Sequence, residues 1–262
     1  MKRIRLDQLL FERGLFPSRS QAAASVLAGE VLLLPERLRA AKPGQLVPNQ
    51  TELELLQRER FVSRGGLKLE HALVSLGLDV TGRRALDVGA STGGFTDCLL
   101  KRGAAAVTCV DVAYGQLDYG LRTDPRVTVI ERCNARWLYP EKLPYPPGVI
   151  VVDVSFISLE KVLPAVLACA APRFDCLALI KPQFEVGREN LGKGGVVRDS
   201  GTRRRALVAV GEAARGLGAA VLAYASSGLP GPKGNRETFI WLAERRRGGV
   251  SELEPAAREV EP

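Results

Sequence analysis

Two lysines and two acidic residues stand where the strands of one sheet would bring them together. Asp153 directly follows the apolar run VIVV, and Lys181 directly follows the apolar run CLALI. In an open α/β sheet the carboxyl ends of the strands line the ligand crevice, so these two side chains are expected to meet there. A lysine whose pKa is lowered by burial and by a neighbouring lysine can act as a general base. A structural ion pair between Asp153 and Lys181 is the alternative interpretation.

Glu237 and Lys68 are the other two members of this set. Glu237 precedes TFIWLA, so it begins a predicted strand and faces the same crevice if that strand runs antiparallel. Lys68 lies in SRGGLKL, just upstream of a glycine-rich segment. Its spacing alone does not separate it from an ordinary exposed lysine on a helix. Together the four side chains predict a site at which a lysine accepts a proton.

The glycine-rich loop GASTGGF follows a predicted strand, RALDVG, and opens a predicted helix, TGGFTDCLLKRG. In that context glycines let the backbone approach a ligand closely, and the helix N-terminus favours an anion. The loop is not a P-loop, because no GK[ST] follows, and it lacks the G-x-G-x-x-G spacing of dinucleotide-binding proteins. The form LDVGASTGGF resembles motif I of the S-adenosylmethionine-dependent methyltransferases.

Two polar residues at later strand ends extend this cofactor site. Asp111 ends the next predicted strand and is placed to hold ribose hydroxyls, while Asn134 follows the third and is placed to reach an adenine edge. S-adenosylmethionine is therefore the expected cofactor. Its predicted binding residues are Gly89, Ala90, Ser91, Thr92, Gly93, Gly94, Phe95, Asp111, Val112, Asn134 and Asp153.

The order of the predicted elements indicates two domains. Residues 1–57 contain two short amphipathic helices, the second capped by Ser18, and short apolar strands, which is typical of a small α+β module. From Arg84 onward continuous apolar strands alternate with helices, and the last two strands are expected to form an antiparallel edge. The predicted fold class is α/β: a Rossmann-like, mostly parallel sheet plus the N-terminal module. We expect a linker at 58–64, the sheet domain at 65–244 and, because apolar residues become sparse, a disordered tail at 245–262.

Charge points to an anionic partner. The chain carries a net charge of +8, and its first 68 residues contain twelve lysines and arginines against seven acidic residues. Nucleic acid and a membrane surface are the two candidate partners. Arg3, Arg5 and Arg19 cluster at the two helix starts, where backbone N–H groups also favour phosphate. An ordinary solvated helical face is the alternative for these arginines.

Several other classes of protein are disfavoured. The five cysteines form no CxxC pair and His71 is the one histidine, so no metal site is expected. Reduced, buried cysteines indicate a cytoplasmic protein. No apolar run approaches the roughly 18 residues of a membrane span, and no signal-peptide pattern opens the chain. We take a monomer as the default.

Residues 86–240 resemble the FtsJ-type ribose 2′-O-methyltransferases, whose Lys-Asp-Lys-Glu tetrad matches Lys68, Asp153, Lys181 and Glu237. A fuller resemblance, to the TlyA (hemolysin A) family, covers nearly the whole chain. It rests on the motifs RLDQLL, PSRSQA, FVSRGGLKLEHAL, LDVGASTGGFTDCLL, VDVAYGQL, DVSFISL, LIKPQFE, GKGGVVRD and GPKGNRETFIW. The resemblance implies an S-four-type RNA-binding domain at 1–57. It also implies S-adenosylmethionine-dependent 2′-O-methylation of cytidine in 16S or 23S ribosomal RNA, or in both.

Further residues are expected to contact RNA. Arg64, Arg132 and Arg188 lie beside the predicted site and would hold phosphates, with ordinary surface charge as the alternative. Phe156 would stack on a flipped-out base, or else belong to the core. The glycine-rich segment 185–198 is expected to close over the substrate.

Other functions remain open at this point. An FtsJ-like enzyme acting on another RNA, such as transfer RNA, and a noncatalytic RNA-binding protein are the alternatives. The second would be expected to lose tetrad or loop residues, and all of them are present. A membrane-lytic protein, which the older family name suggests, would need a long apolar or strongly amphipathic segment.

Overall fold

A computed structural model describes residues 3–56, 60–187, 191–231 and 233–262 of the chain. The chain divides into two compact units, Met1–Glu59 and Arg60–Pro262, which we call the small unit and the large unit. Each unit has its own apolar core, as a domain requires.

The small unit packs two helices against short antiparallel strands. Its elements are β1 (Arg3–Arg5), α1 (Leu6–Glu12), α2 (Arg19–Leu27), β2 (Val31–Leu33), β3 (Leu38–Arg39), β4 (Leu46–Pro48) and β5 (Leu53–Leu55). β1 pairs with β4, and β2 lies between β3 and β5. Leu6, Leu9 and Leu10, which share one face of α1 at helical spacing, are all buried. Ser18 caps α2 by accepting a hydrogen bond from the N–H of Gln21 at 3.2 Å.

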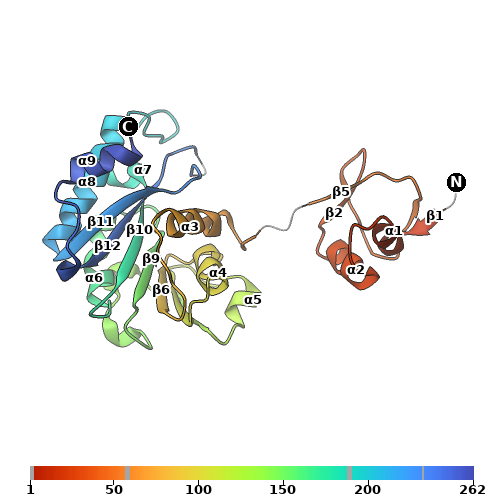
Figure 1. Cartoon of the computed structure of the whole chain (residues 1–262), viewed down its shortest axis with the longest axis horizontal. Coiled ribbons are helices and arrows are strands. Elements are labelled where there is room, and N and C mark those ends of the chain that lie inside the picture. Colours follow the sequence, from red (N-terminus) through yellow and green to blue (C-terminus); the bar gives the residue numbers. More distant parts are fainter. Residues whose placement is uncertain (1–2, 57–59, 188–190, 232) are drawn as a thin grey trace. The chain divides into compact units, whose positions relative to one another are not determined.

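The large unit alternates strands and helices for most of its length (Figure 1). Its α-helices and strands are α3 (Arg64–Ser75), β6 (Arg84–Val88), α4 (Gly94–Lys101), β7 (Ala106–Val110), α5 (Tyr119–Arg122), β8 (Val127–Ile130), β9 (Val149–Val152), α6 (Leu163–Ala168), β10 (Asp175–Ile180), α7 (Pro182–Glu185), α8 (Ser200–Gly216), β11 (Ala219–Ser226), β12 (Thr238–Glu244) and α9 (Leu253–Val260). Short 3-10 helices include η1 (Ala135–Trp137), η2 (Pro140–Lys142), η3 (Leu159–Lys161) and η5 (Arg245–Arg247).

The seven strands form one sheet in the order β11-β12-β10-β9-β6-β7-β8. The pairings from β10 to β8 are parallel, whereas β12 runs antiparallel to both β10 and β11. This is the mostly parallel sheet with an antiparallel edge that the sequence predicts.

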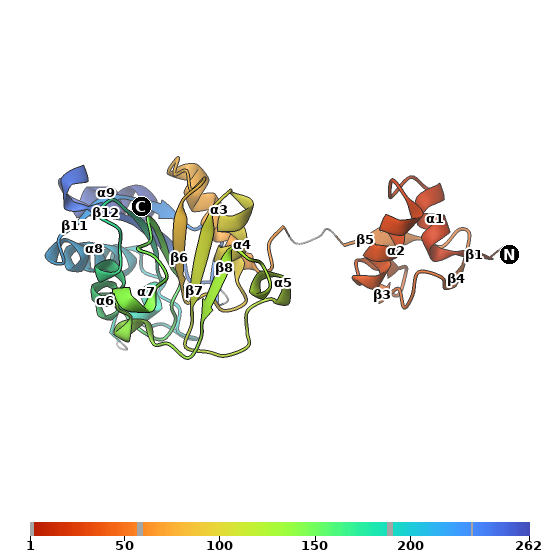
Figure 2. The same ribbon diagram turned by 90° about the horizontal axis from the view of Figure 1, so that it is seen from below.

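Helices cover both faces of the sheet (Figures 1 and 2). Alternation along β9 shows why: Val149 and Val151 pack with α3 and α4, while Ile150 and Val152 pack with α6, α8 and α9. A strand buried on both faces needs apolar residues throughout, which explains the continuous run VIVV. No helix of the described part of the chain is long and apolar enough to cross a membrane.

The C-terminal segment corrects one expectation. Residues 245–262 are not a disordered tail, because α9 packs against α8 and β11. Leu253 and Ala257 lie one turn apart and are buried, with exposed fractions of 3% and 0%. The Glu261 carboxylate accepts a hydrogen bond from Nε of Arg203 at 2.8 Å. The segment is poor in apolar residues overall, but two at helical spacing are enough to anchor it on a neighbouring helix.

The structure also differs from the prediction of a linker at 58–64. Residues 57–59 lie outside the described part of the chain, and residues 60–64 belong to the large unit. Phe61 is 2% exposed and joins the core formed by α3 and α4. The N–H of Val62 donates to Oδ2 of Asp97 at 3.0 Å. Burial of the Phe61 ring therefore draws this stretch into the large unit.

Candidate active site

Five strands of the large sheet begin or end at one edge, and four of them bring a charged residue to it. β10, β9, β6 and β7 are parallel and in register, so the residues that follow them lie along the same edge. β12 runs the opposite way, and Thr238 pairs with Ile180, so β12 begins at that edge. In spatial order the edge carries Glu237, Lys181, Asp153, Gly89 and Asp111.

Lys181 and Asp153 meet at this edge, as expected. Nζ of Lys181 lies 2.5 Å from Oδ1 of Asp153 and donates a hydrogen bond to Oγ of Ser155 at 2.9 Å. Lys181 is 9% exposed. An amine held in a nearly dry position beside one carboxylate is suited to accept and release a proton, and the same contact also fits a structural ion pair.

Lys68 and Glu237 form a second, deeper pair. Lys68 projects from α3, and its Nζ donates to Oε2 of Glu237 at 2.5 Å. The two side chains are 9% and 1% exposed, so Lys68 is not an ordinary surface lysine. Glu237 borders a second hollow, of about 350 Å³, formed mainly by residues 226–238. The sheet register places Glu237 next to Lys181, so the two pairs are neighbours.

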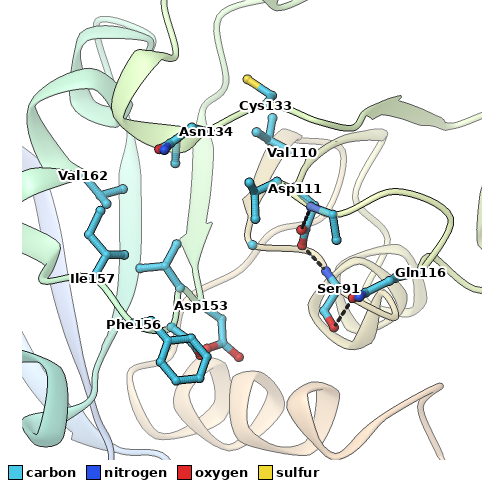
Figure 3. Close-up of a pocket in the computed structure, with 16 residues that line it drawn as sticks. Ser91, Val110, Asp111, Gln116, Cys133, Asn134, Asp153, Phe156, Ile157 and Val162 are labelled. Atoms are coloured by element: carbon cyan, nitrogen blue, oxygen red, sulfur yellow. Dashed lines mark hydrogen bonds between the residues drawn. The ribbon is translucent and has the colours of Figure 1, made fainter.

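A cavity of about 540 Å³ opens beside Asp153, between the ends of β6, β7 and β9 (Figure 3). Six of the predicted cofactor residues line it: Gly89, Ser91, Asp111, Val112, Asn134 and Asp153. Val110, Ile157 and Val162 supply apolar walls. A mostly apolar cleft with a few converging polar groups is the usual form of a small-molecule site.

The glycine loop and Asp111 are tied together at the cavity wall. Oδ2 of Asp111 accepts a hydrogen bond from the N–H of Ser91, and Oδ1 accepts one from the N–H of Ala113, both at 2.7 Å. Ser91 has a φ of +50°, a conformation that non-glycine residues rarely adopt, and this bond stabilises it. A carboxylate has about four lone-pair sites, so Asp111 can still accept two hydroxyl groups.

Gly89 explains why the loop must begin with glycine. Its φ is +84°, and a Cβ at this position would lie 2.3 Å from the carbonyl oxygen of Asp153. Any side chain would therefore push apart the two strand ends that frame the cavity.

The other five predicted loop residues do not line this cavity. Phe95 is 3% exposed and packs against Phe239, with ring centroids 5.8 Å apart. Gly93 and Gly94 are closely packed: a Cβ on Gly93 would meet Leu121, and one on Gly94 would meet Ser63. Ala90 is buried, and the carbonyl of Thr92 accepts a hydrogen bond from the N–H of Asp118. These residues shape and anchor the loop.

Below the loop, Asp87 is fully buried on β6. Its Oδ2 accepts a hydrogen bond from the hydroxyl of Thr96 at 2.7 Å, while Oδ1 receives none in the described part of the chain. Burial raises the pKa of Asp87 to about 7, opposed by the Thr96 hydrogen bond and assisted by the negative charge of Asp153.

The residues of the large unit that are predicted to contact RNA differ in their exposure and in their partners. Phe156 is 91% exposed, so it is not a core residue, and its φ is +64°. The Arg132 guanidinium lies over the ring of the exposed Tyr114, 4.5 Å from its centroid. Arg64 begins α3 and donates to the carbonyl of Pro230 at 3.2 Å. Arg188 lies outside the described residues.

Residues 188–190 of the expected substrate loop are likewise outside the described part. The following residues are anchored. The N–H of Val197 donates to Oδ1 of Asn235 at 2.9 Å, and Nδ2 of Asn235 donates to the carbonyl of Gly195 at 3.0 Å.

In the small unit Arg5 and Arg19 converge on one carboxylate. Oδ2 of Asp7 accepts a hydrogen bond from Arg5 at 2.8 Å and one from Arg19 at 3.3 Å. These bonds, that from Arg5 first, hold the pKa of Asp7 below its ordinary value although burial opposes them. Arg3 is exposed on β1. Both paired arginine side chains remain about half exposed.

Among the cavity residues that the sequence reasoning missed, three have side chains able to form hydrogen bonds. Gln116 lines the cavity with Oε1 3.5 Å from Oγ of Ser91, and Cys133 lies at the end opposite Asp153. Ser155 lines the cavity and contacts Lys181. The motifs VDVAYGQL and DVSFISL contain Gln116 and Ser155, so proximity to Asp111 and Asp153 was an available signal. All five cysteines are free and buried, and the described residues contain no cluster suited to a metal ion.

Residues 61–244 match the family model described as FtsJ-like methyltransferase. The chain is 49% identical over 243 residues to the 16S/23S rRNA (cytidine-2′-O)-methyltransferase TlyA of Mycobacterium tuberculosis H37Rv. The alignment covers 92% of this chain and 90% of that relative.

Two solved structures support the same fold. A Streptococcus thermophilus protein provisionally named a hemolysin is 38% identical with a TM-score of 0.73, over 99% of this chain and 96% of that one. A Listeria monocytogenes protein provisionally described as an S-adenosylmethionine-dependent methyltransferase has a TM-score of 0.51 at 13% identity. It matches 70% of this chain and 99% of its own length, and at that identity the likeness concerns the fold alone.

Proposed function

This chain belongs to the TlyA family, whose large domain is an FtsJ-like methyltransferase, and we propose that it transfers a methyl group from S-adenosylmethionine to the 2′-oxygen of a cytidine ribose in ribosomal RNA. The observation that carries the proposal is the pairing of Lys181 with Asp153 beside a cavity at the carboxyl edge of the sheet. The relative's name supplies the nucleoside and the class of RNA.

The cavity suits S-adenosylmethionine. Asp111 keeps free lone pairs for ribose hydroxyls, and Val112 and Asn134 would flank the adenine. Gly89 lets the backbone approach the ligand, because it places no side chain at the cavity floor. When bound, the cofactor supplies a methyl group already activated by a sulfonium centre. Asp153 borders both the cavity and Lys181, so it would mark the end at which the methyl group lies.

Lys181 is the proposed base. A ribose hydroxyl is a poor nucleophile and must lose its proton as it attacks, so a nearby neutral amine would take that proton. Asp153 attracts the resulting ammonium, and the Lys68–Glu237 pair beside it adds one positive and one negative charge that nearly cancel. Much of the rate would come from holding the hydroxyl in line, since the methyl group needs no further activation.

The small unit is the proposed RNA-binding domain of the S-four type. Arg5 and Arg19 present half-exposed guanidinium groups from a shared carboxylate, which fixes their positions without burying them. Guanidinium groups held in this way suit the phosphate backbone. Arg64, Arg132 and the exposed Phe156 would contact RNA on the large unit.

Transfer of labelled methyl from S-adenosylmethionine to 30S subunits, 50S subunits and transfer RNA tests the proposal. We expect label in ribosomal RNA with the wild type and a loss of about 100-fold to 10,000-fold with Lys181→Ala. Cofactor binding by calorimetry should stay within a few-fold. Lys161→Ala, which removes an exposed lysine of the same unit, is the control and should label normally.

The outcomes separate the alternatives. Label only in transfer RNA would keep the chemistry and overturn the substrate. No label on any RNA with the cofactor still bound would favour a noncatalytic RNA-binding protein. Loss of cofactor binding together with activity in Lys181→Ala would count against a purely catalytic role.

A further inference from the structure

Among the described residues two groups contact the amine of Lys181, and they differ in kind. Oδ1 of Asp153 lies 2.5 Å away but receives no hydrogen bond in the described part of the chain, so this contact is an ion pair. Oγ of Ser155 accepts a hydrogen bond from Nζ at 2.9 Å. Charge attraction depends mainly on distance, whereas a hydrogen bond also depends on angle. The Ser155 hydroxyl is therefore a second contact, distinct from that with Asp153, that helps to give the amine a direction.

The backbone around Ser155 is built to hold its hydroxyl in place. Asp153 is fixed to the sheet, since its N–H donates to the carbonyl of Val88 at 2.9 Å. Immediately after Ser155 the chain turns at Phe156, whose φ of +64° costs energy in a residue other than glycine. A turn that reverses here leaves Phe156 exposed and Ser155 facing both the cavity and Lys181.

A second tie joins this turn to the segment that follows Lys181. The N–H of Leu159 donates to Oε1 of Glu185 on α7 at 3.0 Å. The turn after β9 and the turn after β10 are thus joined at Ser155–Lys181 and at Leu159–Glu185. Such double anchoring holds the Ser155–Lys181 distance against the flexibility of a four-carbon lysine side chain.

We propose that Ser155 is a positioning residue, whose hydroxyl orients Nζ of Lys181 so that its remaining lone pair meets the hydroxyl group that loses its proton. This inference rests on the proposed function, because it requires Lys181 to be the base. A neutral amine has two N–H bonds and one lone pair. Directing one N–H at Ser155 restricts where that lone pair can point.

The test is a comparison of Ser155→Ala, Ser155→Thr and Ser158→Ala in steady-state kinetics with ribosomal subunits. Ser158 controls for the turn itself, because it lies in the same turn, accepts from the N–H of Glu160 at 3.1 Å and interacts with the Glu185 carboxylate, but it neither lines the cavity nor contacts Lys181. We expect Ser155→Ala to lower kcat by roughly 10-fold to 100-fold, as a misplaced catalytic group does. The KM values should change less than about three-fold, Ser155→Thr should recover most of kcat, and Ser158→Ala should match the wild type.

The pH profile adds a readout that a merely structural role would not move. The groups around Lys181 are Asp153 on the β9 turn, Glu237 at the start of β12, Lys68 on α3 and Glu185 on α7. None of them is altered in Ser155→Ala. The serine oxygen stabilises the ammonium form by accepting its hydrogen bond, so its loss should move the acidic limb of kcat/KM to lower pH.

Lysine labelled with carbon-13 at the ε position provides a measurement that needs no RNA. The Lys181 signal is assigned by its absence in Lys181→Arg and is titrated in the presence of S-adenosylhomocysteine. A titration midpoint that is lower in Ser155→Ala and unchanged in Ser158→Ala supports the inference. An unchanged midpoint, a kcat within two-fold of wild type, a loss confined to KM, or no recovery with Ser155→Thr overturns it. A wild type that methylates no RNA would overturn the proposed function instead, and the titration would still decide whether Ser155 orients Lys181.

Discussion

In the small unit one buried carboxylate, Asp7, holds two arginines that remain about half exposed. In the large unit two lysines are each paired with one carboxylate, and the side chains of Lys68 and Glu237 are only 9% and 1% exposed. The first arrangement presents positive charge to a partner while fixing its position. The second removes charge from water, which costs free energy unless pairing or a function compensates.

This contrast indicates different roles for the two units, RNA binding for the small unit and proton transfer for the large one. Exposed guanidinium groups favour phosphate and contribute to affinity, and they lose little by remaining hydrated. A buried amine beside a carboxylate contributes little to binding a large RNA, but it can exchange a proton with a bound group. Perturbing each cluster should therefore change a different measurement.

The largest effect is expected from breaking the buried pair of the large unit. Glu237→Ala leaves Lys68 charged and without its partner, so the free energy of unfolding should fall by roughly 3–5 kcal/mol. Methyl transfer should also fall, because Lys68 is no longer held in place by Glu237 and its uncompensated charge lies beside Lys181. Denaturant unfolding followed by tryptophan fluorescence measures the first effect, since both tryptophans, Trp137 and Trp241, lie in the large unit.

A double variant, Lys68→Met with Glu237→Met, is the matched control for that experiment. Two apolar side chains of similar length leave no buried charge, so stability should return close to the wild-type value while methyl transfer stays low. If the double variant is as unstable as Glu237→Ala, packing rather than charge explains the loss. If it is fully active, the pair has no part in the chemistry.

Most of the sheet could be predicted because its signals are local. A continuous apolar run indicates a strand buried on both faces, and the first polar residue after it marks the strand end. Asp153, Lys181 and Asp111 were placed at one edge on this basis, and the parallel register brings them there. The place of Lys68 in the site does not follow from its spacing, since only the tertiary fold brings α3 to the start of β12.

What escaped prediction depends on contacts between distant segments. Ser155 contacts Lys181 in a turn where Phe156 adopts a left-handed conformation that its residue type does not favour. The sequence predicts that Phe95 binds the cofactor, but its ring packs against Phe239 on β12. The low apolar content of the C-terminal segment did not predict helix α9, although Leu253 and Ala257 stand at helical spacing and are buried.

A smaller effect is expected from the arginines of the small unit. Arg5→Ala combined with Arg19→Ala should weaken binding to ribosomal RNA by about 10-fold, and each arginine removed should lower the salt slope of log K by about 1. Filter binding at several salt concentrations measures both quantities, and cofactor affinity should not change. Arg37→Ala is the control, because Arg37 is an exposed arginine of the same unit that is paired with Glu54. Equal losses for the control would mean that net charge alone, and not the Asp7 cluster, attracts the RNA.

The last comparison concerns pH, and here two buried carboxylates should act in opposite directions. Burial raises the pKa of Asp87 to about 7, so the folded large unit keeps this group protonated after the unfolded chain has ionised it near pH 4. Its contribution to stability is therefore complete below about pH 4 and lost as the pH rises to about 7. The side chain in Asp87→Asn cannot ionise. Between about pH 4 and pH 7 the unfolding free energy of this variant should therefore rise relative to that of the wild type, by an amount on the order of a few kcal/mol.

Asp7 should show the reverse behaviour in the small unit. The hydrogen bond from Arg5 lowers the pKa of Asp7, so its contribution is present above the ordinary value near 4 and is lost as the pH falls through the lowered one. Hydrogen exchange at the α1 amides of the full-length chain, compared with Asp7→Asn, measures it. The large unit should lose the Asp87 contribution toward neutral pH, while the small unit should lose the Asp7 contribution only in acid. Slopes of the same sign for both variants would mean that Asp7 is controlled by burial, as Asp87 is, rather than by its two arginines.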